Sequence, residues 1–597
     1  MCGFIGIVSS QSVDIESLEE ANKKIICRGP DNKKIYYSQE NNFNIGGIFN
    51  RLSIIDLSDA ANQPMVSKDN RYVLLFNGEI FNFQELRKNL INKGYKFYTS
   101  HSDTESLFNT LINYKIDAPK YLRGQFAFVF IDKIKNEIYL CRDRVGQKPL
   151  YYFTENESIS FSSNLISLAQ LKKSTEINQV SIIQYLTYGK IISKETIYKN
   201  IFEVHPGEII KISLSNSKFY KNSTDYWKLE EYYDNKKFNE EEFYEIFDEA
   251  VKLRTKSDVP FATFLSGGLD STSIIKSQKE SNLDVNTFSV YMDNSKYDEK
   301  KYCEQVARTF NTNHTSLNIS NNLTTKNITE ILNTLDEPFA DPSYIPTYLI
   351  SKKISEYFKM ALSGDGGDEL LGGYKRTQDA IKIQKNIFNN LYSKLYKIYP
   401  PYLGTGNHFL SKDMDLKIRY SSYLSDIKLL KLLHFNKPDT ELFSHYQNLE
   451  KSEYKTLMMY EYDFYLSKLM MYKVDRASMA NSVEVRSPFV DNKLIEYVFS
   501  HTNEYFDFKN PKKLLKNYLS DEFNEDFTNR PKQGFMFDVK RFVYENSDYF
   551  YDNINSFEKY LSLDLKSVKK LFQIKTRINS NRIWKIFVLL NYLDNNK

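Results

Sequence analysis

The sequence predicts a protein of two domains, an N-terminal α+β domain and a C-terminal α/β domain that ends in a long helical region. A chain of 597 residues is too long for a single hydrophobic core, so at least two domains are expected. As far as about residue 215 the pattern is rich in short strands with turns between them, whereas beyond about residue 235 short apolar strands alternate with helices. We therefore predict domains at 1–215 and 235–597, with the boundary near residues 215–235.

Strand patterns dominate the first domain. The segment RYVLLFNGEIFN (71–82) predicts a strand that runs into a turn at Asn77-Gly78. FAFVFIDKIKNEIYLCRD (126–143) predicts two strands around a polar turn, and SISFSSN (158–164) predicts another short strand. Between them, FQELRKNLINKG (83–94) has the pattern of a helix that closes at Gly94.

The second domain begins with a helix and continues as alternating strands and helices. NEEEFYEIFDEAVKLR (239–254) carries an Asn239/Glu242 capping pair, followed by apolar residues at helical spacing. The short apolar runs FATFL (261–265), VNTFSVYM (285–292) and KMAL (359–362) alternate with helical patterns, which predicts a parallel sheet covered by helices. From about residue 380 the chain is mostly helical.

Composition and charge are those of an ordinary globular protein. Lys and Arg (80) nearly balance Asp and Glu (76), so the net charge of +4 gives no sign of binding to nucleic acids or anionic membranes. The four cysteines form no Cys-x-x-Cys pair, which favours a reducing compartment and no structural zinc. No apolar run reaches the roughly 18 residues that a membrane span needs, and FIGIV (4–8) is too short for a signal peptide. We expect a cytoplasmic protein.

A glycine-rich loop follows the first strand of the second domain. In FATFLSGGLDSTSIIKSQ (261–278) an apolar strand leads through Ser-Gly-Gly into a helix that starts near Asp270. Glycines let the backbone approach a ligand, and the N–H groups at the start of a helix favour an anion. The Lys-Ser/Thr of a Walker loop is absent. Ser-Gly-Gly-x-Asp-Ser instead resembles the pyrophosphate loop of the ATP pyrophosphatase superfamily; a tight turn without a ligand is the alternative.

A second glycine-rich strand end, MALSGDGGDELLGGY (360–374), carries Asp365, Asp368 and Glu369. Carboxylates gathered where a parallel strand ends suit Mg²⁺, which prefers oxygen ligands together with substrate phosphates. We expect Asp270 and Asp368 to hold a magnesium ion between them. A solvated acidic loop is the alternative.

Cys2 is the candidate nucleophile of the first domain. If Met1 is removed, Cys2 carries both a thiol and the free α-amine of the chain, which is a nucleophile together with a base. The segments CRGPD (27–31), NRLSIIDLSDAANQPM (50–65), FNGEIFN (76–82), SDTE (102–105) and CRDRVGQKPLYY (141–152) together resemble the class II glutamine amidotransferases. With the Ser-Gly-Gly-Leu-Asp-Ser loop, KVDRASMANSVEVRSPFVD (473–491) and RPKQGF (530–535), nearly the whole chain resembles the glutamine-hydrolysing asparagine synthetase family.

This resemblance implies an N-terminal-nucleophile αββα sandwich for the first domain and an adenine-nucleotide α-hydrolase-like parallel sheet for the second. It also implies that Cys2 attacks the side-chain amide of glutamine, while the Asn77 side chain and the Gly78 N–H stabilise the oxyanion. The other glutamine-binding residues that it implies are Arg51 for the α-carboxylate, Glu79 and Asp103 for the α-ammonium, and Leu52, Ser53, Ile54 and Ile55 for the pocket wall.

For the second domain the resemblance implies an ATP site in which a substrate carboxylate attacks the α-phosphorus while Mg²⁺ screens the pyrophosphate. A lysine that stabilises the transition state aligns with Lys512 in NPKKLLKNYL (510–519); Lys513 is the rival, and a solvated lysine face is the alternative. The implied ATP-binding residues are Leu265 and Val290 at the adenine and ribose, Ser363 and Gly364 at the closure of the pocket, and Ser266, Gly267, Gly268, Asp270 and Ser271 at the pyrophosphate. Ammonia released at Cys2 would need a dry passage to the acyl-adenylate.

Three departures from the family pattern concern the acceptor and the domain contact. DEPFADPSYIPTYL (336–349) lacks the Arg-Ala-Ser-Thr segment that asparagine synthetases carry near aspartate, and Asp365 stands where some members have Glu. Asn164 replaces the usual acidic residue after the strand near 161, so a difference in domain coupling is expected. Recognition of aspartate needs a carboxylate for its ammonium, for which we expect Asp365, and a cation for its α-carboxylate, for which we expect Arg376.

The prediction is an ATP-dependent asparagine synthetase that uses glutamine, with Mg²⁺ as its metal. One alternative is the same chemistry on another carboxylate, such as a sugar acid or a cell-wall precursor. The other is a catalytically idle scaffold, against which the retention of Cys2, Asp270 and Asp368 argues, because none of them is needed for folding. The expected partners are small molecules (glutamine, ATP and aspartate or another carboxylate), and a homodimer stays open.

Overall fold

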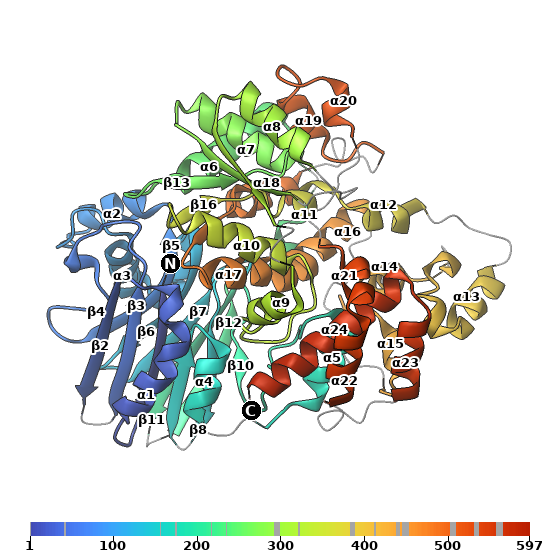
Figure 1. Cartoon of the computed structure of the whole chain (residues 1–597). Helices are drawn as coiled ribbons and strands as arrows, with labels where there is room; N and C mark the ends of the chain where they lie inside the picture. The colour runs from blue at the N-terminus through green and yellow to red at the C-terminus, as the bar shows by residue number, and fades with distance from the viewer. Residues whose placement is uncertain are drawn as a thin grey trace.

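The computed structural model shows a β-sandwich, a parallel sheet with its helices, and a helical C-terminal region (Figure 1). It describes the chain except for residues 1, 41–42, 156, 173–175, 216–217, 235, 292–298, 320–322, 383–388, 411–413, 437–441, 444–452, 502–508, 531–536, 557–564 and 597. Among the described residues no helix is both long enough and apolar enough to span a membrane.

Two six-stranded antiparallel sheets form the N-terminal domain. Their strand orders are β10-β8-β9-β1-β3-β2 and β12-β11-β7-β6-β5-β4. The first sheet contains β1 (Gly3–Ser9), β2 (Asn32–Gln39), β3 (Asn44–Arg51), β8 (Tyr151–Glu155), β9 (Ser158–Ser162) and β10 (Phe202–Glu203). The second contains β4 (Met65–Val66), β5 (Tyr72–Ile80), β6 (Gly124–Asp132), β7 (Glu137–Arg142), β11 (Glu208–Ser215) and β12 (Lys218–Asp225). Because β12 pairs with β11, the second sheet extends past residue 215 into the interval where we expected the boundary.

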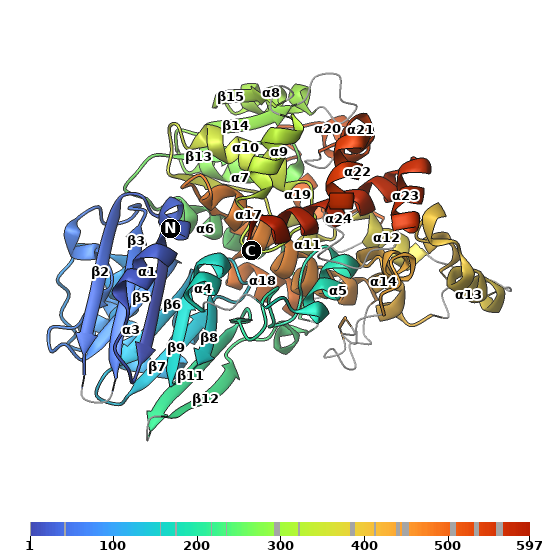
Figure 2. The ribbon, with the colours of Figure 1, turned by 60° about the horizontal axis from the view of Figure 1, so that its bottom comes forward.

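The two sheets stack through the inward side chains of their strands. In β1, Phe4 and Val8 belong to the core between the sheets, whereas Ile5 packs with Leu18 of α1 (Ile15–Asn22) on the outside. Successive side chains of a strand point to opposite faces, so one apolar strand can serve both layers. Helix α1 and α4 (Leu165–Lys172) cover the first sheet, and α3 (Asp103–Tyr114), with α2 (Phe83–Asn92) beside it, covers the second (Figure 2). The predicted αββα sandwich is confirmed.

The predicted turn at Asn77-Gly78 is wrong. Strand β5 runs through both residues without a break, and both pair with β6. Gly78 has a φ of +146°, and a Cβ atom at this position would lie 2.0 Å from the carbonyl oxygen of Gln125. Glycine is needed here because the neighbouring strand passes so close. The helix end predicted at Gly94, by contrast, is confirmed, since α2 ends at Asn92 and Gly94 has a φ of +89°.

Five parallel strands form the sheet of the second domain, in the order β15-β14-β13-β16-β17. They are β13 (Phe261–Phe264), β14 (Asn286–Tyr291), β15 (Asn313–Asn318), β16 (Met360–Leu362) and β17 (Glu484–Arg486). The helices among them are α6 (Glu240–Arg254), α7 (Leu269–Glu280), α8 (Lys300–Thr309), α9 (Thr325–Leu332) and α10 (Tyr344–Ile354). The predicted parallel sheet is confirmed. Because β13 and β16 are neighbours, the glycine-rich loops at their carboxyl ends lie side by side.

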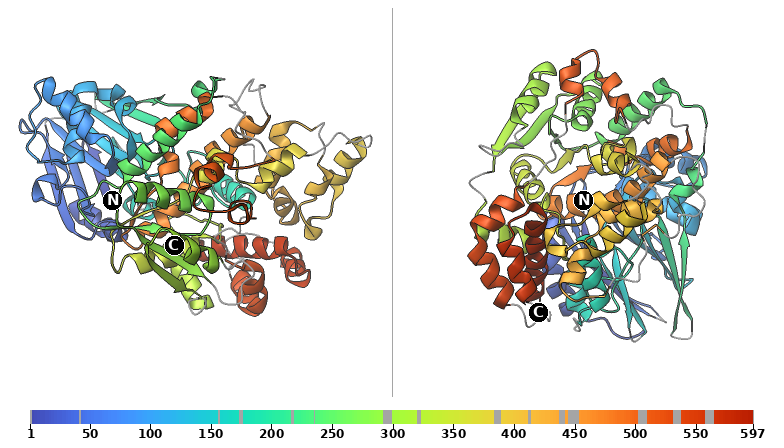
Figure 3. Two further views of the ribbon diagram at one scale, coloured as in Figure 1. Left: turned by 90° about the horizontal axis from the view of Figure 1, so that it is seen from above. Right: turned by 90° about the vertical axis from the view of Figure 1, so that its right-hand side faces the viewer.

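Helices make up most of the chain after β16, as the sequence predicts (Figure 3). They are α11 (Gly367–Leu371), α12 (Lys375–Lys382), α13 (Asn389–Ile398), α14 (Leu416–Leu424), α15 (Ile427–Leu432), α16 (Glu453–Tyr460), the π-helical η8 (Glu461–Met470), α17 (Met471–Met479), α18 (Asn492–Ser500), α19 (Lys513–Tyr518), α20 (Glu525–Thr528), α21 (Val539–Glu545), α22 (Ser547–Ser556), α23 (Leu565–Gln573) and α24 (Arg577–Asn595). Helix α17 packs against α10 and β17, between the parallel sheet and the sandwich (Figure 1).

Candidate active sites

The first candidate site surrounds Cys2, which directly precedes β1 and is 7% exposed. Its backbone N–H donates to Asn77 Oδ1 at 3.1 Å. Asn77 Nδ2 is buried and has no hydrogen-bond partner among the residues that the structure describes. A buried amide donor without a partner is costly unless a ligand uses it. The Asn77 side chain contacts the Cys2 backbone, so an unpartnered donor on it fits the oxyanion-binding role expected of Asn77.

Two buried carboxylates belong to the same site. Glu79 lies on β5 two residues after Asn77, and Asp103 is the first residue of α3. Asp103 accepts hydrogen bonds from the N–H groups of Ile80 and Thr104, at 3.1 and 2.7 Å. Burial, and after it the charge of Asp103, raises the pKa of Glu79 well above its ordinary value. A positive group is the natural ligand for such a pair, as the α-ammonium of an amino acid would be.

Arg51, at the end of β3, is held against the segment that follows it. Its Nη1 donates to the carbonyl oxygen of Ser58 at 2.9 Å and to Asn62 Oδ1 at 2.7 Å. Leu52, Ile54 and Ile55, which we expected in the pocket wall, are buried. Ser53 is half-buried, and its backbone N–H donates a hydrogen bond to Asp31 Oδ2. These contacts hold the guanidinium of Arg51 against the segment that follows β3.

The electrostatics of the Cys2 thiol reflect these neighbours. Burial raises the pKa of the thiol, while the positive chain terminus, a hydrogen bond with the Leu52 backbone and the charge of Arg51 lower it. The structure thus brings Cys2, Arg51, Leu52, Asn77 and Glu79 together, although β1, β3 and β5 are separated in sequence. Because burial raises the pKa of the thiol, an attack on an amide needs a base at hand.

The second candidate site lies at the carboxyl edge of the parallel sheet. The hydroxyl oxygens of Ser266 and Ser271 are 3.1 Å apart, and the Gly268 N–H donates to Ser266 Oγ at 3.3 Å. Gly267 has a φ of +67°, in the left-handed region that favours glycine. Arg530 donates to the carbonyl oxygen of Gly267, so the first residue of the RPKQGF block contacts this loop; residues 531–535 lie outside the described residues.

The two glycine-rich loops interlock. A Cβ atom on Gly364 would lie 2.9 Å from Asp270 Cβ, and one on Gly367 would lie 2.5 Å from Asp270 Oδ1. No side chain therefore fits at either glycine without displacing Asp270. This close approach explains why the second loop is rich in glycine.

Asp270 and Asp368, the predicted metal ligands, converge on the ammonium group of Lys512. Lys512 Nζ lies 2.6 Å from each carboxylate oxygen of Asp270 and 2.5 Å from Asp368 Oδ1. Two carboxylates around one positive charge fit a Mg²⁺ ion whose other ligands are substrate phosphates and water. Within the described part of the chain, no group of three or more His, Cys, Asp or Glu could hold a metal by itself. The contacts of Lys512 favour it over Lys513, which begins α19.

A cavity of about 680 Å³ opens beside these loops. The expected ATP-binding and metal residues that line it are Leu265, Ser266, Gly268, Asp270, Ser271, Ser363, Gly364 and Asp368, and Asp365 lines it as well. Gly267, Val290 and Lys512 are not among its described lining residues. Val290 lies near the end of β14, where it pairs with Leu317 of β15.

The structure does not place Arg376 where we expected it. Its guanidinium pairs with both carboxylate oxygens of Glu461, at 2.7 and 2.5 Å, and lies over the rings of Tyr374 and Tyr465. Arg376 is therefore not among the described residues that line the cavity, whereas Lys473 of α17 is. A local run of basic residues after the loop could not reveal this, because Glu461 comes from a distant helix.

Two protein families match this chain, one for each domain. The family model described as glutamine amidotransferase domain matches residues 1–227, and the model described as asparagine synthase matches residues 242–593. The chain belongs to the asparagine synthetase family. It is 30% identical to asparagine synthetase [glutamine-hydrolyzing] 1 of Bacillus subtilis, over 99% of this chain and 96% of that protein. A putative asparagine synthetase 2 of Methanocaldococcus jannaschii is 35% identical over 63% of this chain and 76% of its own length.

Among solved structures, a glutamine phosphoribosylpyrophosphate amidotransferase of B. subtilis aligns with a TM-score of 0.28 at 15% identity, covering 50% of this chain and 68% of that one. Membership of the asparagine synthetase family makes this chain an enzyme of the ligase and amidotransferase type, and the family uses ATP as a substrate.

Arg486 of β17 contacts both sites. Its Nη2 lies 3.4 Å from Glu79 Oε1 in the site around Cys2. Its carbonyl oxygen accepts a hydrogen bond at 3.0 Å from the N–H of Ser363, which lines the large cavity. Glu484, on the same strand, accepts from Gln125 Nε2 at 3.0 Å. Arg486 lies in the block 473–491, but its role could not be predicted from that block, because only the packing of distant segments brings it to Glu79.

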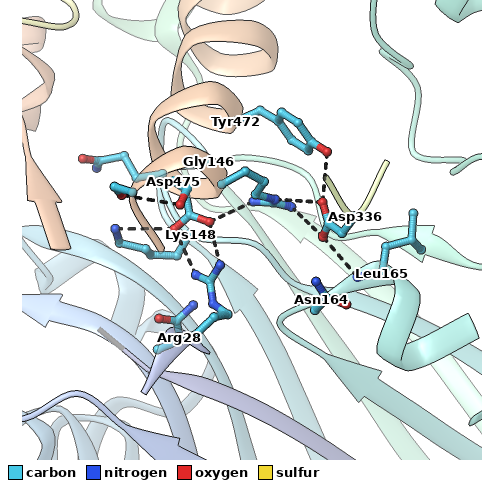
Figure 4. Close-up of polar contacts among 12 residues, drawn as sticks. Arg28, Gly146, Lys148, Asn164, Leu165, Asp336, Tyr472 and Asp475 are labelled. Carbon is cyan, nitrogen blue, oxygen red and sulfur yellow. Dashed lines mark hydrogen bonds and ion pairs between the residues drawn. The ribbon is translucent and has the colours of Figure 1, made fainter. Parts of the chain in front are cut away.

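A buried network of ion pairs joins the domains around α17 (Figure 4). Arg28 donates to both carboxylate oxygens of Asp475, at 2.9 and 3.0 Å, and its Nε donates to the carbonyl oxygen of Cys2 at 3.3 Å. Arg476 binds Asp475 on one side and Asp336 on the other, at 3.1 and 3.0 Å. Arg28 lies in the CRGPD segment (27–31), which indicated a functional region, but the sequence did not predict its partner Asp475.

Asn164 has a defined place in this network. Its side chain accepts a hydrogen bond from the Ser167 N–H at 2.9 Å, at the start of α4. The next N–H, that of Leu165, donates at 3.2 Å to Asp336 of the other domain (Figure 4). A carboxylate at a helix N-terminus is favourable. Here the synthetase domain supplies that charge to a helix of the glutaminase-type domain.

Proposed function

We propose that this chain is a glutamine-hydrolysing asparagine synthetase. It hydrolyses glutamine to glutamate and ammonia at Cys2, activates aspartate with ATP as aspartyl-AMP, and combines the two to give asparagine, AMP and pyrophosphate. The observation that carries the proposal is that one chain holds a Cys2 site and a pyrophosphate-loop site, joined by a buried interface. The similarity to a glutamine-hydrolysing asparagine synthetase over 99% of the chain supports the same conclusion.

In the glutaminase step the Cys2 sulfur attacks the side-chain carbon of glutamine. The free α-amine of Cys2 takes the thiol proton and later delivers a proton to the departing ammonia. Asn77 Nδ2 and the Gly78 N–H stabilise the tetrahedral oxyanion, for which the unpartnered Nδ2 is the supporting observation. Glu79 and Asp103 bind the α-ammonium of glutamine, and Arg51 binds its α-carboxylate.

In the synthetase step an oxygen of the aspartate side chain attacks the α-phosphorus of ATP, and pyrophosphate leaves. Asp270 and Asp368 are the residues that would hold Mg²⁺, which when bound screens the charge of the phosphates. Lys512, which already contacts both carboxylates, neutralises the negative charge that develops around the α-phosphate. Ser266, Gly268 and Ser271 donate hydrogen bonds to the leaving pyrophosphate.

Ammonia must cross from one site to the other without meeting water. A second, small cavity of about 10 Å³ is lined by residues of both domains. It is lined by Gln125 and Lys148 of the first domain and by Ser363, Val474 and Val485 of the second, among others, and Ser363 also lines the large cavity. Because Gln125 pairs with Glu79 in the β5–β6 ladder, the small cavity adjoins the site around Cys2. This arrangement supports an internal route between the sites.

The test is an assay of the purified protein with ATP, Mg²⁺ and aspartate, with either glutamine or ammonium chloride as the nitrogen source. We expect asparagine, and one pyrophosphate for each asparagine. Glutamine hydrolysis without any asparagine would refute aspartate as the acceptor, and other carboxylates would then be screened by pyrophosphate release.

A further inference from the structure

An ion pair lines the large cavity beside the second glycine-rich loop. Lys473, on α17, and Asp365, after β16, both line the cavity, and Lys473 Nζ lies 3.4 Å from Asp365 Oδ1. The side chains are 9% and 22% exposed, respectively. The pair is therefore largely shielded from bulk solvent, and the cavity is where a ligand would meet it.

The ammonium group of Lys473 is poorly satisfied within the protein. Among the described residues, its Nζ donates to Asp365 Oδ1 at the long distance of 3.4 Å and to the sulfur of Met470 at 3.5 Å. An ammonium group has three N–H donors, and a thioether sulfur is a weak acceptor. A buried cation with such partners gains much from an additional anion.

Other cations near the cavity are engaged or exposed. Arg376 is saturated by Glu461, and Lys512 by Asp270 and Asp368. Lys540 and Arg577 also line the cavity, but both are exposed, so a contact with either would be weakened by solvent. Lys473 is the described lining cation that is both buried and beside a carboxylate.

We propose that Lys473 binds the carboxylate of the acceptor that does not react, and that Asp365 binds its α-ammonium. This inference rests on the proposed function and specifies its substrate class, an α-amino dicarboxylic acid. The ion pair opens when the acceptor enters, and the ammonium and α-carboxylate of the ligand each replace one half of it. Charge is conserved in that exchange, so a zwitterionic head group is preferred over a neutral or singly charged one. The remaining carboxylate is then free to approach the α-phosphate of ATP.

The experiment separates the two contacts with two analogues of aspartate. Succinate lacks the α-ammonium, and 3-aminopropanoate lacks the α-carboxylate. Both are measured as inhibitors of asparagine formation from ammonia, in the full-length protein and in the variants Lys473→Met, Lys473→Arg and Asp365→Asn. Where a variant turns over too slowly, binding is measured by the ligand-induced shift of its thermal unfolding in the presence of ATP.

Loss of one charge-assisted contact is expected to weaken binding about 10- to 100-fold. Lys473→Met should weaken the binding of aspartate and of succinate by this factor and leave the binding of 3-aminopropanoate nearly unchanged. Lys473→Arg should retain most of the wild-type affinity for aspartate and succinate. Asp365→Asn should weaken the binding of aspartate and of 3-aminopropanoate, and it should leave the binding of succinate unchanged. Glutaminase activity of Lys473→Met should remain, because Cys2 lies in the other domain.

Lys133→Met is the matched control, since Lys133 is also buried and ion-paired, to Glu40 at 2.7 Å, but lies in the sandwich. It should leave the KM for aspartate unchanged. If the wild-type protein makes asparagine and Lys473→Met has an unchanged KM for aspartate, the assignment of Lys473 is wrong and the proposed function stands. If the wild-type protein makes no asparagine while glutamine hydrolysis persists, both the proposed acceptor and this inference are overturned.

Discussion

Replacing Asp475 by Asn would remove the central carboxylate of the interface between the domains. Asp475 is 2% exposed and is surrounded by Arg28, Arg476 and Lys148, with nitrogen–oxygen distances of 2.9, 3.1 and 3.9 Å. The substitution keeps the shape of the side chain and takes away its charge. Three buried cations then lose their common counter-ion.

The cost can be estimated from the pKa of Asp475. Against the effect of burial, the charges of Arg28, Arg476 and Lys148 lower this pKa from 3.8 to about 2. The difference corresponds to about 2.5 kcal/mol of native-state stability. A buried arginine left unpaired raises the loss, so we expect the free energy of unfolding to fall by about 2–5 kcal/mol at pH 7.

The sign of the pH dependence follows from the lowered pKa. The native state holds the Asp475 proton less tightly than the unfolded chain, so the stabilisation is present above about pH 4 and disappears as the pH falls through about 2. The midpoints of urea unfolding of wild type and Asp475→Asn should therefore differ at pH 7 and approach each other in acid.

The same substitution should affect catalysis unevenly. Arg28, freed from Asp475, no longer holds the Cys2 carbonyl oxygen in place. If half of the lost energy acts on the position of Cys2, the ratio of glutamine-dependent to ammonia-dependent synthesis falls about tenfold. The assay measures both rates in one preparation, so that differences in folded fraction cancel.

Asp132→Asn provides the matched control. Asp132 is fully buried and binds Arg71 through both carboxylate oxygens, each at 2.9 Å, but both residues belong to the sandwich. It should lower stability and leave the ratio of the two rates unchanged. An unchanged ratio in Asp475→Asn, or an equal drop in Asp132→Asn, would refute the argument.

Three further predictions follow from the separate sites and from one buried charge. Cys2→Ala should abolish glutamine hydrolysis and leave synthesis from ammonium chloride intact; loss of both activities in a folded protein would contradict independent sites. Asp270→Asn should stop pyrophosphate release, because the loss of charge compensation raises the barrier to this step by several kcal/mol. Glutamine hydrolysis, measured by glutamate formation, should be unaffected. The Nζ atom of Lys468 is buried without a hydrogen-bond partner among the described residues, and burial lowers its pKa from 10.5 to about 8. Lys468→Met should therefore raise the stability by about 1–3 kcal/mol at pH 7, a gain that fades between pH 8 and 10.5 and whose absence in thermal unfolding would contradict the pKa shift.

The sequence by itself determined most of the local elements and the family to which the chain belongs. The apolar run FAFVF of β6, the Asn239 cap of α6 and the runs FATFL and KMAL predicted their elements because these depend on neighbouring residues. The glycine-rich loops and the residues around Cys2 are short motifs of fixed spacing. Such motifs indicate a kind of site even where the distant partners are unknown.

Only the tertiary structure decided which charges meet. Asn77-Gly78 has the sequence of a turn, but β6 pairs along it and keeps β5 extended. Arg376 follows the acidic loop in sequence, yet its guanidinium pairs with Glu461, whereas Lys473 of α17 lines the cavity. Ion pairs form between whichever side chains the fold brings within about 4 Å, and sequence separation does not bear on that distance. Local patterns therefore predict strands, helices and loops, whereas the partner of a buried charge depends on how those elements pack.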